Sequence, residues 1–212
     1  MTRYLPVYLL IDSSGSMNGE PIHSVNEGLR MMISALRHDP YALETVKLSL
    51  ITFDREVKEI FPLTPIEDIV LEEIVPPKSG PTHLGEALEH LITQYHNDMS
   101  QNEGKNNFSP MLFVMTDGKP SDLQLFRQMS EKIKRLKFGA IIGCIAGPKA
   151  KKEYMEMFAD PVVSLEITDS SAFSAFFKWV SDSISAGNQS SGLDAGGANQ
   201  LPPPPKEINI VI

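Results

Sequence analysis

The spacing of apolar residues along the chain switches repeatedly between a strand period and a helix period. Apolar runs of strand length occur six times, at residues 7–11, 46–54, 57–61, 111–115, 138–145 and 162–167. Apolar residues at helical spacing lie between these runs, at 22–36, 84–95, 123–136 and 173–184. Strands that alternate with helices are typical of a mostly parallel sheet with helices on both faces. The pattern therefore predicts a doubly wound α/β domain with a six-stranded sheet.

One connection in this pattern is too short to contain a crossover helix. Only two residues separate the strand predicted at 46–54 from the strand predicted at 57–61. This spacing predicts a hairpin, and therefore one antiparallel strand at the edge of the sheet. Two further segments, 66–74 and 149–158, are expected to form short helices, and the first should lie across the sheet edge. A final helix is expected over 170–185.

The composition changes after the last predicted helix. Residues 1–186 form the predicted domain, whereas residues 187–206 are rich in Gly and Ser and then contain four consecutive prolines. Such a segment is expected to be a linker that is flexible first and polyproline-like later. Residues 207–212 are apolar and β-prone. They are compatible with a free terminus, or with a strand that adds to a sheet edge of a partner or of this domain.

Composition and charge argue against several classes of protein. A chain of 212 residues with 42% hydrophobic and 22% charged residues can bury an ample core. Its formal net charge of -8 argues against a general nucleic-acid binder, which needs a basic surface. No apolar run approaches the ~20 residues of a membrane span, and residues 1–6 lack the pattern of a signal peptide. The single cysteine, Cys144, lies in an apolar run and is expected to be a core residue. These features predict a cytoplasmic protein that does not bind membranes.

The first strand ends abruptly in polar residues that could bind a metal ion. Asp12, Ser14 and Ser16 follow the apolar run at alternate positions. In open α/β sheets, ligands bind at the carboxyl ends of the strands. Carboxylate and hydroxyl oxygens suit Mg²⁺, Mn²⁺ or Ca²⁺ better than softer metals. An isolated Asp-x-Ser-x-Ser loop could also be a turn in which side chains cap backbone N–H groups.

Two other places in the chain offer matching oxygen donors. Thr82 precedes a predicted helix, and Asp117 follows the buried strand at 111–115 in the sequence Thr-Asp-Gly. Both places are loops that leave predicted elements, so they can meet the first loop at one edge of the sheet. Five oxygen-bearing side chains therefore favour a metal site over a simple turn. They are Asp12, Ser14, Ser16, Thr82 and Asp117.

The Asp-x-Ser-x-Ser loop, the lone Thr and the strand-end Thr-Asp-Gly, in this order, resemble the von Willebrand factor type A family. They match the family's metal-ion-dependent adhesion site at all five positions, and the resemblance covers about residues 4–186. The resemblance implies a Rossmann-like fold and a bound Mg²⁺, Mn²⁺ or Ca²⁺ ion. In the family, the serines and often the threonine contact the metal, and the aspartates often act through water. A protein partner's Asp or Glu then completes the coordination.

Within this family the chain looks most similar to the TerY-type proteins of bacterial tellurium-resistance clusters, with Asp-Gly-Lys-Pro after the last strand of the site, at residues 117–120. Proteins of that type are associated with a PP2C-type phosphatase and a protein kinase in tellurium-resistance and stress systems. The resemblance implies a metal-dependent protein-interaction module that scaffolds or regulates this pair and is not an enzyme.

The alternative function is that of a phosphohydrolase of the haloacid dehalogenase kind. Such enzymes also place an acid directly after a strand, but they require Asp-x-Asp, in which the second acid is a general acid/base. Here Ser14 stands at the position of the second acid. A serine hydrolase is less well supported, because the sequence contains no Gly-x-Ser-x-Gly elbow.

Overall fold

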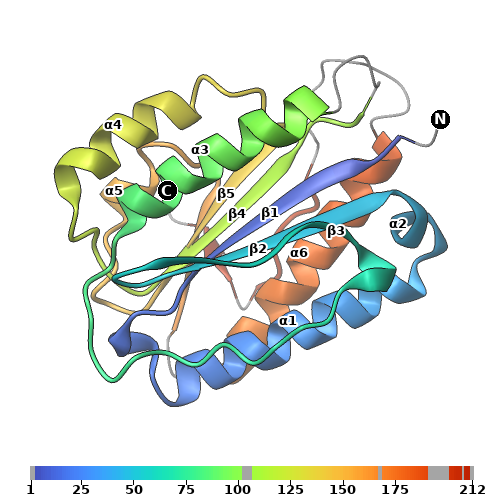
Figure 1. Ribbon diagram of the computed structural model, residues 1–212. Helices are drawn as coiled ribbons and strands as arrows, with labels where there is room; N and C mark the ends of the chain where they lie inside the picture. Colours follow the sequence, from blue (N-terminus) through green and yellow to red (C-terminus); the bar gives the residue numbers. More distant parts are fainter. Residues whose placement is uncertain (1–2, 102–106, 167–168, 191–200, 207, 211–212) are drawn as a thin grey trace.

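The computed structural model describes residues 3–101, 107–166, 169–190, 201–206 and 208–210. In this part of the chain one sheet runs through the molecule (Figure 1). Its strand order is β3-β2-β1-β4-β5-β6-β7. The strands are β1 (Leu5–Asp12), β2 (Val46–Phe53), β3 (Val57–Pro65), β4 (Met111–Thr116), β5 (Ala140–Ala146), β6 (Val162–Leu165) and β7 (Asn209–Ile210). Strands β2, β1, β4, β5 and β6 are parallel, and β3 pairs with β2 in antiparallel fashion. The predicted six-stranded, mostly parallel sheet with an antiparallel edge hairpin is confirmed, and β7 adds a short strand beyond β6.

Helices cover both faces of this sheet (Figure 1). Helices α1 and α6 pack against each other on one face, and α3 and α4 pack against each other on the opposite face. The helices are α1 (Glu20–His38), α2 (Pro40–Thr45), α3 (Leu84–Gln101), α4 (Leu123–Ile133), α5 (Lys152–Met155) and α6 (Ser170–Ser190). Two single 3-10 turns, η1 (Gly15–Met17) and η2 (Ile66–Asp68), follow β1 and β3.

Strand β1 shows why the two layers of helices form. All eight of its residues are buried, because it lies between two parallel strands and beneath helices on both faces. Successive side chains point to opposite faces of a strand. Leu9 and Ile11 therefore join the core under α1 and α6, whereas Tyr8 and Leu10 join the core under α3 and α4.

The helix expected at 66–74 does not form. After η2, residues 69–83 contain no helix or strand until α3 begins. In a helix, the N–H and the carbonyl of Ile74 would bond to other backbone groups. Here both bond to a side chain of α1. The Asn26 amide nitrogen donates to the Ile74 carbonyl at 2.9 Å, and its oxygen accepts from the Ile74 N–H at 2.9 Å. A buried asparagine thus holds this segment extended along α1, and a local pattern of apolar residues cannot reveal such a partner.

Two other short helices differ from the expectation in detail. Helix α2 was not predicted, although Asp39 followed by Pro40 is a typical helix start. The Asp39 carboxylate accepts hydrogen bonds from the N–H groups of Tyr41 and Ala42 at 3.0 and 3.3 Å. The helix expected at 149–158 is limited to the four residues of α5.

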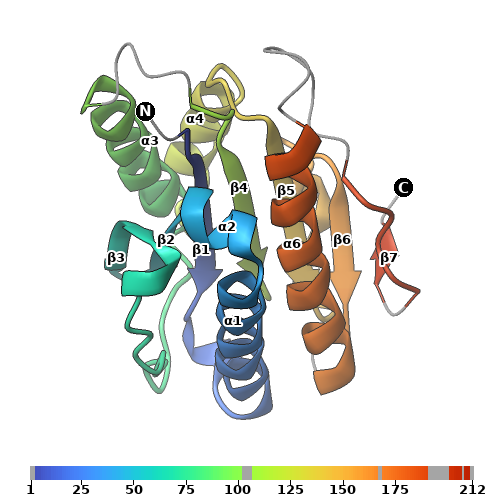
Figure 2. The same cartoon turned by 90° about the vertical axis from the view of Figure 1, so that its right-hand side faces the viewer.

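The C-terminal part of the chain returns to the sheet. Helix α6 extends to Ser190, five residues past its expected end. Residues 209–210 then pair with β6 in antiparallel fashion, with Ser164 opposite Asn209 and Val163 opposite Ile210. Figure 2 shows β7 at the outer edge of the sheet, beyond β6. No helix in the described ranges is both long and apolar enough to cross a lipid bilayer.

Candidate metal centre

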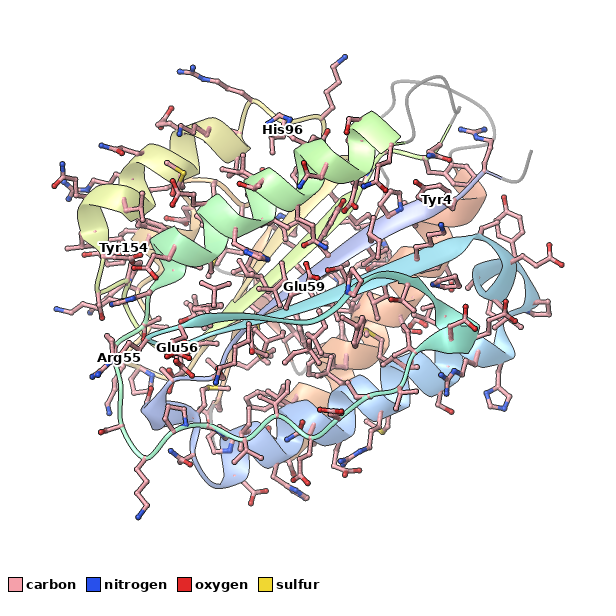
Figure 3. All side chains as sticks on the ribbon, viewed as in Figure 1. Tyr4, Arg55, Glu56, Glu59, His96 and Tyr154 are labelled. Atoms are coloured by element: carbon pink, nitrogen blue, oxygen red, sulfur yellow. The ribbon has the colours of Figure 1, made fainter. Side chains whose placement is uncertain are left out.

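Neighbouring strands bring two distant acids to one edge of the sheet. Strand β1 ends at Asp12, and β4 ends at Thr116, directly before Asp117. The two strands are parallel and adjacent, with Ile11 opposite Met115. Their carboxyl ends therefore lie side by side, as expected for a ligand site in an open α/β sheet. Arg55 and Glu56, in the turn between β2 and β3, lie at this same end, opposite the end that holds Tyr4 (Figure 3).

The carboxylate of Asp12 is held by hydrogen bonds to both of its oxygens. Its Oδ1 accepts from the Ser14 N–H at 2.8 Å, and its Oδ2 accepts from the hydroxyl of Thr116. Asp12 is fully buried, so these bonds fix the orientation of the carboxylate. Sequence reasoning placed Thr116 next to the site but gave it no function. Its position on the strand beside β1 is the signal that could have identified it as a partner of Asp12.

The two serines of the loop connect to the second acid. The hydroxyls of Ser14 and Ser16 lie 3.2 Å apart, and the Ser16 hydroxyl donates to Asp117 Oδ1 at 2.7 Å. Asp117 is buried, whereas Ser16 is exposed at the rim. Ser16 lies in the 3-10 turn η1, which begins at Gly15, and its hydrogen bond joins this turn to the residue that follows β4.

Thr82 reaches the same edge through its backbone. Its N–H donates to the Ser121 hydroxyl at 3.1 Å, and its carbonyl accepts from the Ser121 N–H at 2.8 Å. A methyl group added at Gly118 would lie 3.3 Å from the Thr82 hydroxyl oxygen. The structure therefore brings Thr82 against the residue that follows Asp117. All five predicted side chains lie on three segments that meet at one edge.

The residues that lead to Thr82 also support the first loop from outside. An added Cβ at Gly15 would lie 2.5 Å from the Ser79 Cα, so any side chain there would force one of the two segments to shift. The Asn18 side chain donates to the carbonyls of Gly15 and Pro77, at 3.0 and 2.6 Å. Asn18 therefore ties the 3-10 turn to the segment that leads to Thr82. Sequence reasoning treated Asn18 only as a neighbour of the loop.

The two acids carry charge that the described protein groups do not balance. Burial raises the pKa of Asp12 to about 6, and hydrogen bonds from Thr116 and Ser14 offset only part of this rise. Burial also raises the pKa of Asp117, although the Ser16 hydrogen bond and the positive charge of Lys149 act in the opposite direction. Among the described side chains, no ion pair within 4.0 Å links either acid to a cationic group. A divalent cation would supply the missing positive charge.

The donor set decides which metal could fit. Within the described part of the chain, no three His, Cys, Asp or Glu side chains gather into a metal-binding group. A cation at this edge would therefore depend on hydroxyl oxygens as well as the two carboxylates. Such hard oxygen donors suit Mg²⁺, Mn²⁺ or Ca²⁺.

The fold and the sequence together identify the class of protein. The family model of the von Willebrand factor type A domain matches residues 7–179. The chain therefore belongs to this family, whose members are commonly metal-dependent adhesion or protein-interaction modules and are generally not enzymes. A search of curated protein sequences gives no match.

Solved structures share the fold at low sequence identity. Proximal thread matrix protein 1 from the mussel byssus is 22% identical, with a TM-score of 0.65, and the match covers 87% of this chain and 48% of that one. A von Willebrand factor type A protein from Catenulispora acidiphila is 12% identical, with a TM-score of 0.65 and coverages of 87% and 43%. The chain thus spans about half the length of these relatives or less.

Two of the related structures contain metals. Another structure of the mussel protein, 20% identical with a TM-score of 0.60 and coverages of 87% and 48%, has a zinc-occupied metal-ion-dependent adhesion site. The Plasmodium vivax TRAP protein, 18% identical with a TM-score of 0.56 and coverages of 82% and 73%, is loaded with manganese. At this level of identity the likeness to this chain establishes the fold alone.

Proposed function

We propose that this chain is a metal-dependent protein-interaction module with a complete metal-ion-dependent adhesion site. The metal-binding residues are Asp12, Ser14, Ser16, Thr82 and Asp117. One observation carries the proposal. The buried Asp12 and Asp117 carboxylates lie with the Ser14 and Ser16 hydroxyls at the carboxyl edge of the sheet, where Thr82 adjoins Gly118, and burial raises the pKa of both acids. A cation placed there is stabilised by both charges.

Each residue has a distinct part in this proposal. Thr116 and the Ser14 N–H orient Asp12, and Ser16 orients Asp117 through its 2.7 Å hydrogen bond. The exposed position of Ser16 leaves the cation accessible from outside. When bound, the cation supplies a coordination position for an Asp or Glu of a partner protein. The surrounding loops then select among partners by shape and charge.

Mg²⁺ is the proposed metal, with Mn²⁺ or Ca²⁺ as alternatives, because the donors are carboxylate and hydroxyl oxygens. Isothermal titration calorimetry on the wild type and on Asp12→Ala tests this assignment. We expect Mg²⁺ or Mn²⁺ to bind the wild type and not the variant. Equal binding by both proteins would refute the site.

The cellular setting is proposed from the sequence resemblance to TerY-type proteins. We infer a cytoplasmic role in a bacterial tellurium-resistance or stress system, in which the module scaffolds or regulates a PP2C-type phosphatase and a protein kinase. The buried, single Cys144 is compatible with a reducing compartment. Affinity capture with purified candidate phosphatase and kinase tests this role. Retention in Mg²⁺ and release in EDTA are expected, and retention in EDTA would contradict the proposed mode of binding.

The phosphohydrolase alternative lacks its second acid. The side chain two residues after Asp12 is the hydroxyl of Ser14, which cannot act as a carboxylic general acid/base. Turnover of a generic phosphate ester that disappears in Asp12→Ala would support that alternative instead.

A further inference from the structure

The C-terminal segment lies against a surface that resembles a peptide-binding site. We call residues 201–206 and 208–210 the strap. Its first part lies beside α6, and its end forms β7 at the edge of β6 (Figure 2). The ten residues 191–200 connect the strap to the end of α6. The strap is therefore a tethered segment seated on the surface of the domain.

The first contact of the strap is with an aromatic side chain. The indole N–H of Trp179 donates to the carbonyl of Pro202 at 2.8 Å. Trp179 is only 3% exposed, and its ring packs beside Phe176 with a centroid distance of 6.3 Å. An indole that donates to a carbonyl within a proline-rich segment is the chemistry by which aromatic grooves recognise polyproline peptides.

The second contact is with the sheet. Ile208 is 4% exposed and belongs to the core cluster under α1 and α6. Its N–H donates to the Pro205 carbonyl at 3.0 Å, which turns the strap toward β6. The two residues of β7 then pair with Ser164 and Val163. An apolar anchor followed by strand pairing is the chemistry of β-strand addition.

The strap fits this surface incompletely. A cavity of about 430 Å³ remains between α6 and the strap. Its lining includes Ala175 and Trp179 from the helix and Pro202, Pro203 and Pro205 from the strap. Among the described residues, Asn209 and Ile210 of β7 pair with two of the four residues of β6. A longer or bulkier segment could therefore make more contacts than the strap does.

We propose that the surface formed by Trp179 and the edge of β6, which the strap covers in this structure, binds a proline-rich segment of a partner protein that continues into an apolar strand. The strap competes with this partner segment for the surface from within the same chain. Tethering gives the strap an effective concentration in the mM range, so a partner must bind more tightly than the strap to displace it. This site is separate from the proposed metal centre and does not depend on it.

The charges at the rim indicate what kind of recognition to expect. Lys178 and Asp182 border the cavity and pair with each other at 2.8 Å on exposed positions of α6. Neither charge needs a partner from the bound peptide. Recognition therefore rests on the indole hydrogen bond, strand pairing and apolar burial, and its affinity should depend only weakly on salt.

The fluorescence of Trp179 reports directly on this site, because it is the only tryptophan in the sequence. We compare the wild-type chain of 212 residues with its Ile208→Asp variant, in which a charge replaces the buried apolar anchor. In the variant we expect emission at longer wavelength and stronger quenching by acrylamide, with an unchanged circular dichroism spectrum. If Ile208→Asp does not fold, Ile208→Ser replaces it as a milder variant.

A peptide with the sequence of residues 200–212 is then added to the variant, together with a scrambled control. We expect the wild-type peptide to restore the original emission saturably and the scrambled peptide to leave it unchanged. In the wild type the strap already occupies the site, so the same peptide should leave the emission unchanged. Equal emission of wild type and variant would overturn the proposal, and so would a folded variant whose emission the peptide does not restore.

Discussion

Ser16 donates a 2.7 Å hydrogen bond to Asp117, although 101 residues separate them in the chain. This bond joins the loop after β1 to the end of β4, and it is possible because β1 and β4 are parallel neighbours. A cation bound between Asp12 and Asp117 would reinforce the same junction.

The first prediction concerns the pH dependence of the metal-free protein. Burial raises the pKa of Asp12 from 3.8 to about 6, so the folded state binds this proton more tightly than the unfolded state. The contribution of Asp12 to stability is therefore full below pH ~4 and is lost as the pH rises through about 6. At pH 7.5 the ionised carboxylate costs up to about 3 kcal/mol.

In EDTA, Asp12→Asn should therefore be more stable than the wild type at pH 7.5, and this advantage should shrink at pH 4.5. Urea unfolding of both proteins at both pH values measures the difference. Asp182→Asn makes the same substitution at an exposed carboxylate of α6 and is the matched control. A wild type that matches Asp12→Asn at every pH would contradict the role of burial.

The second prediction separates two neighbouring serines. Ser14→Ala removes a proposed metal ligand, whereas the Ser13 hydroxyl donates to Asp54 at 3.4 Å, outside the proposed ligand set. We expect Ser14→Ala to abolish Mg²⁺ binding and Ser13→Ala to retain it. Both variants should lose less than about 1.5 kcal/mol of stability, because each change removes one hydrogen-bonding hydroxyl.

Asp117→Ala is expected to behave like Ser14→Ala, with a folded domain that binds neither Mg²⁺ nor a metal-dependent partner. Calorimetry and circular dichroism measure binding and fold separately. An unfolded Asp117→Ala would show that this edge is mainly a structural element.

The third prediction concerns the close approach of the first loop to the segment before Thr82. In Gly15→Ala the new methyl carbon would lie 2.5 Å from the Ser79 backbone, so one of the two segments must shift. Overpacking of this kind costs about 1–3 kcal/mol. We expect weaker Mg²⁺ binding in thermal-shift titrations, because the shift moves the segment that carries Thr82.

Gly80→Ala is the matched control, since its nearest neighbour would be a Pro77 side-chain atom at 3.8 Å. It should bind Mg²⁺ like the wild type. Equal loss of binding in both variants would show that chain flexibility, and not the contact with Ser79, is what matters.

The fourth prediction tests the packing of α1 against α6. A methyl group at Gly28 would lie 2.1 Å from the Phe177 ring. Gly→Ala inside a helix normally stabilises by roughly 0.5–1 kcal/mol, but here the clash should reverse the sign and cost about 1–3 kcal/mol. A double-mutant cycle with Phe177→Leu, followed by urea unfolding, measures the coupling. The double variant should be more stable than the sum of the single changes predicts, and strict additivity would disprove the contact.

The sequence by itself determined the architecture, because each core element has a local signal. The all-apolar run before Asp12 identified a strand buried on both faces, and the two-residue connection before Val57 identified the antiparallel hairpin. The five candidate ligands were also found from sequence, since each follows an apolar run or precedes a helix. Strand ends in a parallel sheet meet at one edge, so local patterns and topology suffice for that prediction.

Only the tertiary structure decided the contacts between segments that are far apart in the chain. Asn26 keeps the residues around Ile74 extended. The Thr116 hydroxyl donates to Asp12. The Trp179 indole donates to the Pro202 carbonyl of the strap. Each contact pairs a polar group with a partner many residues away. Apolar periodicity reports which side of an element is buried, but it does not report which polar groups meet there. Those partners depend on the packing of the whole chain.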